Sequence, residues 1–304
     1  MKQKKVNILM ATFNGEDFLC DQIKSIVRQT YTNWELYIGD DGSHDRTRKI
    51  IANFETLDSR IHLIKFKDSG SHGQLLNFKR LMYYVEPLDY DYIMFADQDD
   101  VWHENKVTDT LDSMLQIEKG PTLIYTNYDE NDIHGNLNLR YGSLFHKKYG
   151  MQQLLLQNWI MGCTMMINRE LADLGISIPL EAENHDNWLV LVALTYGKIY
   201  YLDESTMMHR IHENNVTKNI SQNKFLRPEK RFLNDLKNKK KFRNRNINLM
   251  VKLLSIDFKK TTNYALLFLK ILNTRSKLKR IALMEKNGFV GLNLHKTIKF
   301  LLMV

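Results

Sequence analysis

Short, mostly apolar runs alternate with amphipathic stretches over the first 130 residues. Each run has the length of one buried strand, and the stretches between them carry apolar residues at helical spacing, as Phe18, Ile23 and Ile26 do. Strands that alternate with helices predict a parallel sheet in an α/β layer fold. The predicted strands cover 6–11, 34–39, 61–66 and 92–96, and the predicted helices cover 17–29, 45–54 and 75–85.

The pattern is less regular in the second part of the chain. A run at 159–167 indicates a buried strand or loop around Gly162, the stretch 186–194 indicates a helix, and 198–202 indicates a strand.

The composition changes near Ser221. Lys, Arg and Asn dominate beyond it, and helical patterns with apolar faces then run from Val251 to the end. We therefore expect one domain at 1–220 and a basic, amphipathic helical region at 221–304.

Polar clusters follow three of the predicted strands. In an open parallel sheet, ligands bind beyond the carboxyl ends of the strands, so these clusters are candidates for a site. They are Thr12-Phe13-Asn14, Asp40-Asp41-Gly42-Ser43 and Asp97-Gln98-Asp99-Asp100.

The last cluster places three carboxylates within four positions, directly after a buried strand. One of them, Asp99 or Asp100, is placed to cap a following helix, but a cap needs only one carboxylate. Clustered like charges disfavour ionisation unless a cation neutralises them. A hard divalent cation that also binds a substrate's phosphates is the expected partner.

Other polar segments leave two interpretations open. The segment Gly39 to Thr47 is either a turn with a helix cap or a site that accepts hydrogen bonds from a nucleotide. Asp186, after Asn184 and His185, is either a helix cap or a general base.

A second basic and polar cluster runs from His209 to Asn215. Arg210 with two neighbouring histidines is suited to phosphate oxygens, and a solvated loop is the alternative.

The bulk composition is that of an ordinary folded protein: 304 residues, 43% hydrophobic and 26% charged. Its two cysteines, Cys20 and Cys163, lie far apart and predict neither a disulfide framework nor a zinc site, so we expect a reducing cytoplasm. The first apolar run is too short for a secretory signal. No stretch approaches the roughly 18 apolar residues of a membrane span.

The positive charge of the chain is concentrated in one region. Between Lys224 and Arg245 lie ten Lys and Arg residues against two acidic ones, a surplus equal to the net charge of +8. A solvated surface, an anionic membrane surface contacted through 224–304, and a homo-oligomer interface are the three interpretations. Few aromatic residues accompany the charges, so we expect no nucleic-acid binding.

Taken in order, these motifs resemble family 2 glycosyltransferases, most closely the bacterial rhamnosyltransferase-like members that build surface polysaccharides. The resemblance covers about residues 5–220. It rests on 6–14, 39–47, 96–102, 162–171, 185–189 and 209–216.

The resemblance implies a GT-A fold, a nucleotide-sugar donor, Mn²⁺ or Mg²⁺, and an inverting displacement. It also implies a saccharide or lipid-linked acceptor, reached from the cytoplasm or from the inner leaflet of the plasma membrane. Two departures, Ala11 for proline and His209 for tyrosine, leave the donor open between dTDP-linked and UDP-linked sugars.

The resemblance also implies roles for individual residues. Asp186 falls at the catalytic base and Asp99 at the metal ligand. Thr12, Asn14, Glu16, Asp40, Asp41 and Asp97 fall in the nucleotide site, Arg210 and His212 near the diphosphate, and Trp102, Gly162, Cys163 and His185 in the acceptor pocket.

Two other classes of protein remain as alternatives. A sugar nucleotidyltransferase is expected to carry a glycine-rich, basic phosphate loop after the first strand, which 11–16 lacks. A non-catalytic carbohydrate-binding or scaffold protein has no need of both the triple carboxylate and Asp186.

Overall fold

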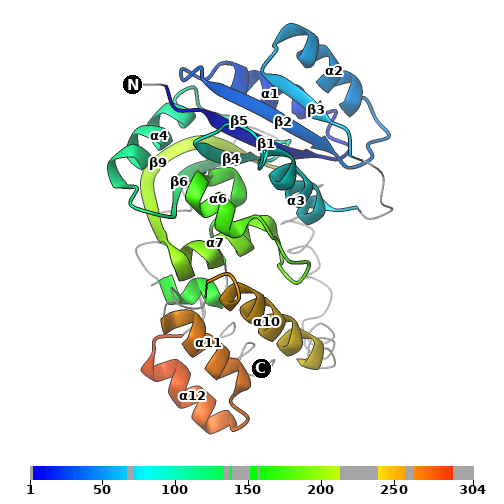
Figure 1. The fold of residues 1–304 in the computed structure, drawn as a ribbon. Coiled ribbons are helices and arrows are strands. Elements are labelled where there is room, and N and C mark those ends of the chain that lie inside the picture. Colours follow the sequence, from blue (N-terminus) through cyan, green and yellow to red (C-terminus); the bar gives the residue numbers. More distant parts are fainter. Residues whose placement is uncertain are drawn as a thin grey trace.

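The computed structural model describes residues 3–66, 72–132, 137–138, 151–156, 158–212, 239–257 and 263–289. These residues form one mixed sheet with helices on both faces and a cluster of C-terminal helices at one end (Figure 1). The strands follow the order β3-β2-β1-β4-β8-β6-β9-β5, with β7 paired to β6.

The first half of the sheet is parallel, as the alternation of strands and helices predicts. β1 (Val6–Thr12) lies between β2 and β4, and β3 lies at the edge beside β2. Thr12 is in register with Asp40, and Met10 with Ala96, so the polar clusters that follow these strands meet at one edge. The other elements are α1 (Leu19–Val27), β2 (Trp34–Asp40), α2 (Thr47–Leu57), β3 (Ile61–Ile64), α3 (Gln74–Val85) and β4 (Tyr92–Ala96).

The second half of the sheet is mixed. β8 runs antiparallel to β4 and to β6, whereas β9 runs parallel to β6 and antiparallel to β5. The bounds are β5 (Val101–Trp102), β6 (Thr122–Asp132), β7 (Leu137–Asn138), β8 (Met165–Asn168) and β9 (Lys198–Ile211).

β9 is much longer than the strand predicted at 198–202. It continues past two register shifts beside β6 and pairs Met208 with Val101. His209 and Arg210, from the cluster that follows the predicted strand in the sequence, therefore lie within β9 itself, beside the acidic segment, and His212 comes directly after it.

The strands bury alternate side chains in two cores, one on each face of the sheet. Leu9, Ile93 and Phe95 pack with α3, α6 (Arg169–Gly175) and α7 (His185–Tyr196). Ile8, Met10 and Met94 pack with α1 and α4 (Lys106–Ile117). Apolar burial of this kind is the main favourable term in folding.

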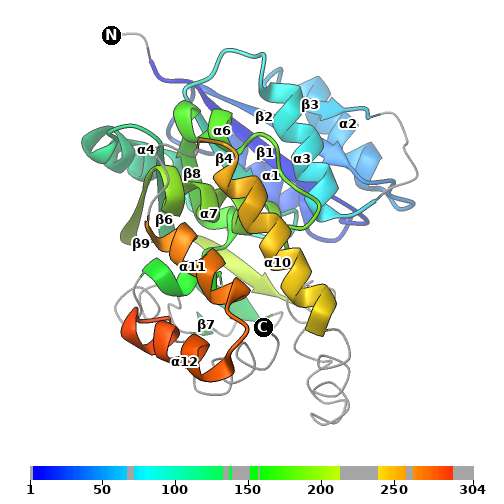
Figure 2. The same ribbon diagram turned by 60° about the horizontal axis from the view of Figure 1, so that its bottom comes forward.

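The C-terminal helices share the first of these cores. α10 (Lys239–Leu254), α11 (Asn263–Asn273) and α12 (Lys277–Lys286) contribute buried side chains to it, including Leu253 and Phe268 (Figure 2). The Tyr196 hydroxyl donates a hydrogen bond of 2.5 Å to the Leu253 carbonyl. Most of the basic stretch that starts at Lys224, and the predicted boundary at Ser221, lie outside the described residues, so that boundary stays a prediction. None of the helices in the described ranges is long and apolar enough to span a bilayer.

Candidate active site

A cavity of about 350 Å³ opens at the carboxyl ends of β1, β2 and β4. The opposite wall comes from the start of α7 and from a short 3-10 turn at Gly162–Thr164. The lining residues are Ala11, Thr12, Phe13, Asp41, Gly73, Gln74, Asn77, Asp97, Gln98, Asp99, Met161, Gly162, Asn184, His185, Asp186 and His209.

Three of the predicted nucleotide-binding residues lie in the turns behind the cavity and do not line it. Asn14 adopts a φ of 45°, and its Oδ1 accepts a hydrogen bond of 2.9 Å from the His44 N–H. The Asp40 carboxylate accepts from the Ser43 N–H at 3.1 Å and pairs with Arg48 at 2.6 Å. These contacts join the β1–α1 and β2–α2 turns into one rigid edge.

Glu16 belongs to the same edge. Its carboxylate accepts hydrogen bonds from the backbone N–H and the Nε of Arg46, at 2.9 Å and 3.0 Å. The backbone N–H of Arg46 is the main reason that the pKa of Glu16 is lowered.

Thr12, Asp41 and Asp97 do line the cavity. Asp41 follows β2, and its carboxylate reaches the segment just before α3. One oxygen accepts a hydrogen bond from the Gly73 N–H at 2.5 Å, and the other lies 3.2 Å from His72 Nδ1. Gly73 has a φ of 126°, which a side chain would disfavour, so glycine here allows the backbone to reach the carboxylate.

The acidic segment after β4 is paired with the end of β9. His209 Nδ1 lies 2.7 Å from Asp100 Oδ1, and His212 Nε2 lies 2.8 Å from Asp99 Oδ2. His212 also stacks on Phe18, with ring centroids 4.4 Å apart. The two histidines therefore supply hydrogen bonds to carboxylates that the chain withdraws from water.

The electrostatics of this segment reflect the crowding of negative charge. Burial, and then the carboxylates of Asp100 and Asp99, raise the pKa of Asp97 to about 8. Burial alone lowers the pKa of His209, but the same carboxylates outweigh it and raise that pKa to about 9. Burial also raises the pKa of Asp99, against the effect of His212.

Asp100 is not a helix cap, contrary to one of the alternatives above. It is fully buried and is followed by β5, and α4 begins only at Lys106. Its Oδ2 has no hydrogen-bond partner within the described ranges.

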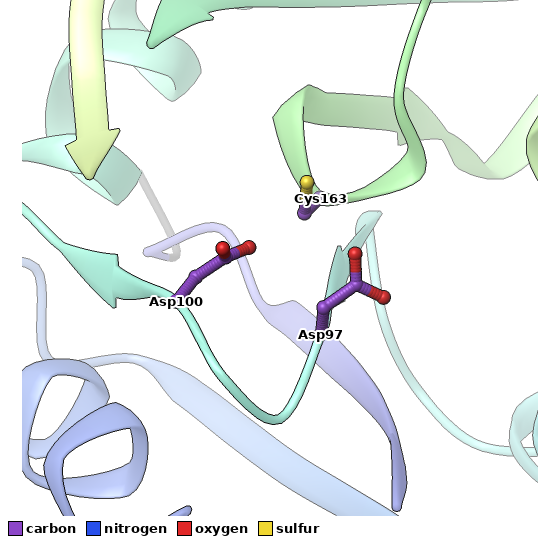
Figure 3. A group of neighbouring side chains, drawn as sticks. All are labelled: Asp97, Asp100 and Cys163. Atoms are coloured by element: carbon purple, nitrogen blue, oxygen red, sulfur yellow. The ribbon is translucent and has the colours of Figure 1, made fainter. Parts of the chain in front are cut away.

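Cys163 lies against this buried carboxylate and not in the lining of the cavity. Its sulfur and one oxygen each of Asp97 and Asp100 lie within 4.8 Å of one another, with the side chains pointing together (Figure 3). Burial raises the pKa of the thiol well above its usual range.

Trp102 is likewise absent from the lining. It is 2% exposed in the core beneath the acidic segment, where Lys106 Nζ lies 5.0 Å from the centre of its ring. Burial lowers the pKa of Lys106 to about 8, and its Nζ donates to the Thr206 hydroxyl at 2.9 Å. Trp102 therefore does not line this cavity, and the acceptor-pocket role that the resemblance implies for it stays a prediction.

Arg210 also lies away from the cavity. Its guanidinium pairs with Asp21 at 3.3 Å and lies 5.3 Å from the centre of the Phe18 ring.

Asp186 stands in the first turn of α7, on the wall that faces the acidic segment. Its carboxylate accepts hydrogen bonds from the Asn187 N–H at 2.5 Å, the Gly162 N–H at 3.2 Å and Asn158 Nδ2 at 3.4 Å. Burial outweighs these bonds and raises the pKa of Asp186 to about 6. The helix begins after Asn184, so Asp186 does not serve as its cap residue.

His185 is wedged between this wall and the core. Its ring packs in a tilted arrangement against Phe78 and Phe95, with centroids 3.8 Å and 4.8 Å away. Burial lowers the pKa of His185 to about 3, so the ring is neutral beside Asp186. Gly162 makes room for it, because a Cβ there would lie 2.4 Å from His185 Nε2.

Several lining residues were not singled out from the sequence. Gln98 accepts the Phe13 N–H at 2.9 Å and donates to the Phe13 carbonyl at 3.1 Å, which fixes the acidic segment to the end of β1. Gln74 donates to Asp97 at 3.1 Å, and Asn77 donates to the Gly39 carbonyl at 2.7 Å. Only the position of Gln98 between two aspartates could have marked it in the sequence as a residue of the site. Nothing in the sequence marks Gln74 and Asn77 of α3.

Comparison with known proteins gives a consistent picture. The sequence model of Glycosyl transferase family 2 matches residues 7–175. The dTDP-rhamnosyl transferase RfbG of Shigella flexneri is 32% identical over 232 residues, which is 70% of this chain and 75% of RfbG. The UDP-Glc:alpha-D-GlcNAc-diphosphoundecaprenol beta-1,3-glucosyltransferase WfgD of Escherichia coli is 30% identical over 196 residues, 62% of this chain and 69% of WfgD.

Solved structures share the fold at low sequence identity. Residues 1–349 of S. aureus TarS in complex with UDP-GlcNAc give a TM-score of 0.59 at 16% identity, covering 97% of this chain and 78% of that one. The mannosyltransferase PcManGT of Pyrobaculum calidifontis, in complex with GDP-Man and Mn²⁺, gives 0.54 at 12% identity, covering 99% and 86%. The predicted GT-A fold is confirmed by this likeness.

The contact between Gly162 and His185 can be tested by stability. Gly162→Ala should lower the free energy of unfolding by about 1–3 kcal/mol, the usual cost of overpacking, in urea titrations. Because one contact causes the loss, the penalty should largely disappear in a His185→Ala background, as a double-mutant cycle measures. An equal penalty in both backgrounds would contradict the contact.

Proposed function

The chain belongs to glycosyl transferase family 2, and on this basis we propose that it moves a sugar from a nucleoside-diphosphate donor to a hydroxyl group of a saccharide acceptor, with inversion at the anomeric carbon. That it is a glycosyltransferase follows from the family. The donor, the acceptor, the stereochemistry and the residue roles below are our proposal.

One observation carries the proposal: Asp186 and the acidic segment face the same cavity, although about ninety residues separate them in the sequence. A displacement at an anomeric carbon needs a base on the incoming side and charge stabilisation on the leaving side. Asp186 on one wall is a candidate for the base, and the acidic segment on the other wall is a candidate for charge stabilisation through a bound cation.

Asp186 is the proposed base. Its carboxylate is held by two backbone N–H groups and by Asn158, so its orientation does not depend on the acceptor. A pKa raised to about 6 makes it a better proton acceptor than an ordinary carboxylate while it stays ionised at neutral pH. The proton passes from the acceptor hydroxyl to Asp186 as that oxygen bonds to the sugar, and no covalent enzyme intermediate is needed.

Asp97 and Asp99 are the proposed holders of a divalent cation, Mn²⁺ or Mg²⁺. The residues fit such an ion, because they offer hard oxygen ligands and their mutual repulsion is what a cation relieves. When bound, the ion would stabilise the negative charge of the departing diphosphate. The Mn²⁺ named with PcManGT supports this assignment.

His212 is the proposed support of the metal ligand. It holds Asp99 at 2.8 Å and is itself fixed by stacking on Phe18. A histidine that orients a ligating carboxylate restricts its geometry without contacting the substrate.

The donor is proposed to carry uracil or thymine. RfbG is named for a dTDP-linked donor and WfgD for a UDP-linked one, and both bases present the same N3–H donor and flanking carbonyls. Asp41, at the cavity's edge beside Gly73, is the proposed acceptor for that N–H. The name of WfgD also includes a diphosphoundecaprenol-linked acceptor, which supports a lipid-linked saccharide as the acceptor here.

Replacing the base should separate chemistry from binding. Asp186→Asn should lower kcat by roughly 10²–10⁴-fold, because the amide does not accept the proton. The Kd for UDP or dTDP, measured by calorimetry, should change little. Asp173→Asn, a half-exposed carboxylate outside the cavity, is the matched control and should behave as wild type. Normal turnover by Asp186→Asn would rule out this base.

The raised pKa predicts the acid side of the pH profile. Because Asp186 works when deprotonated and its pKa is about 6, kcat/KM should be about half-maximal near pH 6, fall below it and level off roughly one pH unit above it. Asn158→Ala should move this limb to higher pH, since the lost hydrogen bond stabilises the charged carboxylate. A limb near pH 4, or one that Asn158→Ala leaves in place, would contradict the assignment.

The role proposed for Asp99 can be tested by measuring Mn²⁺ binding, without an activity assay. Asp99→Asn should weaken Mn²⁺ binding in the presence of UDP by more than about 10-fold, because even groups that only orient metal ligands contribute roughly 10–100-fold. Paramagnetic resonance of free Mn²⁺ measures this directly, with Asp173→Asn again as control. Unchanged Mn²⁺ affinity would remove Asp99 from the site.

A further inference from the structure

The turn between α11 and α12 presents four cations around one exposed leucine. Lys270, Arg275, Lys277 and Lys279 are all exposed, and the side chain of Leu278 is 79% exposed. The group spans ten positions, from the last turn of α11 across the connecting segment into the first turn of α12. We refer to these five residues as the basic turn.

The charge of the basic turn is not compensated within the described ranges. None of its four cations has a carboxylate within ion-pair distance there, and the first turn of α12 holds no acidic residue. By contrast, two basic residues of α10 are paired with the catalytic domain, Arg245 with Glu183 and Lys252 with Glu181, both at 2.7 Å. The described residues 239–257 and 263–289 contain twelve Lys and Arg residues and two acidic ones, so the local potential is strongly positive.

The basic turn connects two of the C-terminal helices, and these helices share a core with α7, the helix that carries Asp186. α10 and α11 pack against the segment 151–156 and α7, and Asn158 and Asn187, which both hydrogen-bond Asp186, border the small cavity beneath α10. β2, β3 and α2 lie at the opposite end of the molecule (Figure 1). A surface bound by the basic turn would therefore be on the acceptor side of the cavity.

We propose that the basic turn docks on an anionic lipid bilayer, with its Lys and Arg side chains among the phosphate headgroups and Leu278 inserted beneath them. This inference rests on the proposed function in one respect, that the acceptor is linked to a lipid. Docking then holds the acceptor wall of the cavity next to the membrane that carries the acceptor.

The apolar component favours a bilayer over a nucleic acid. Cations alone would suit either polyanion, but an exposed leucine between two lysines has no partner on a phosphate backbone, and no aromatic side chain of the turn is available for base stacking. Basic residues that flank an apolar side chain are the pattern of interfacial helices.

Vesicle flotation of the full chain tests the proposal. Wild-type protein should float with vesicles of phosphatidylcholine and phosphatidylglycerol at about 0.1 M salt and not with phosphatidylcholine alone. Binding should be lost at about 1 M salt, where the screening length falls from about 10 Å to about 3 Å. A Lys270→Gln, Arg275→Gln, Lys277→Gln, Lys279→Gln variant should bind at least about 100-fold more weakly, given the contribution of each cation near a charged surface.

Two controls make the result specific to this turn. A variant with Lys24, Arg28, Lys49 and Lys119 changed to Gln loses the same charge from exposed positions in or just after α1, α2 and α4, and it should bind like wild type. Leu278→Ser keeps all the charge and should weaken binding by about 10-fold, since a buried CH₂ contributes about 0.8 kcal/mol. Thermal unfolding of every variant should match wild type, because all the altered side chains are exposed.

The outcomes separate docking from catalysis. Equal binding by the two quadruple variants, equal binding of Leu278→Ser and wild type, or charge-dependent binding to a DNA duplex but not to vesicles would each overturn the proposal. Hydrolysis of a nucleotide sugar without vesicles should be the same in all variants. If wild type floats as expected but turns over no donor, the proposed function fails and the docking surface stands.

Discussion

The crowding of carboxylates where β4 ends is the constraint on which the site depends. Asp97, Asp99 and Asp100 lie at one strand end, and Asp100 is completely buried. Ionised groups are stable in such a place only if hydrogen bonds and opposite charges accompany them. The raised pKa values of Asp97 and Asp99 indicate that the described chain compensates these charges only in part. The proposed cation would supply the rest of the compensation.

The compensation that the chain does supply comes from the second half of the sheet. His209 and His212 reach Asp100 and Asp99 because β9 is long enough to pass β6 and pair with β5. Lys106, at the start of α4, adds a third basic group below the segment. The length of β9 thus determines whether the acidic segment has these two partners.

The two walls of the cavity are built by different means. The wall from β1, β2 and β4 is fixed by hydrogen bonds between turns, in which Asn14, Asp40 and Gln98 take part. The wall with Asp186 is fixed by packing, since His185 fills the space that Gly162 leaves open and α7 is buried against α3, α6 and α10. The C-terminal helices share the core of this wall, so their exposed charges are carried by helices that pack with α7.

The sequence by itself determined the parallel half of the fold and the identity of the polar strand ends. Alternating apolar runs place Thr12, Asp41 and Asp97 at one edge, because parallel strands end together. Local pattern left open whether Asp186 faces a cavity, and it missed the true length of β9, where exposed residues interrupt the apolar pattern. The acceptor-pocket role of Trp102 came from the family resemblance and not from local pattern, and the structure buries this side chain in the core.

Only the tertiary structure decided which carboxylates point into the cavity and which hold turns. Asp40 and Asp41 are neighbours with the same chemistry, yet one pairs with Arg48 behind the edge and the other faces the cavity. That difference depends on strand direction and on contacts between segments far apart in the chain, such as the N–H of Gly73 at Asp41 and the imidazole of His209 at Asp100. Such contacts produce no periodic pattern in the sequence, because each one joins two single residues and does not involve the residues next to them in the chain.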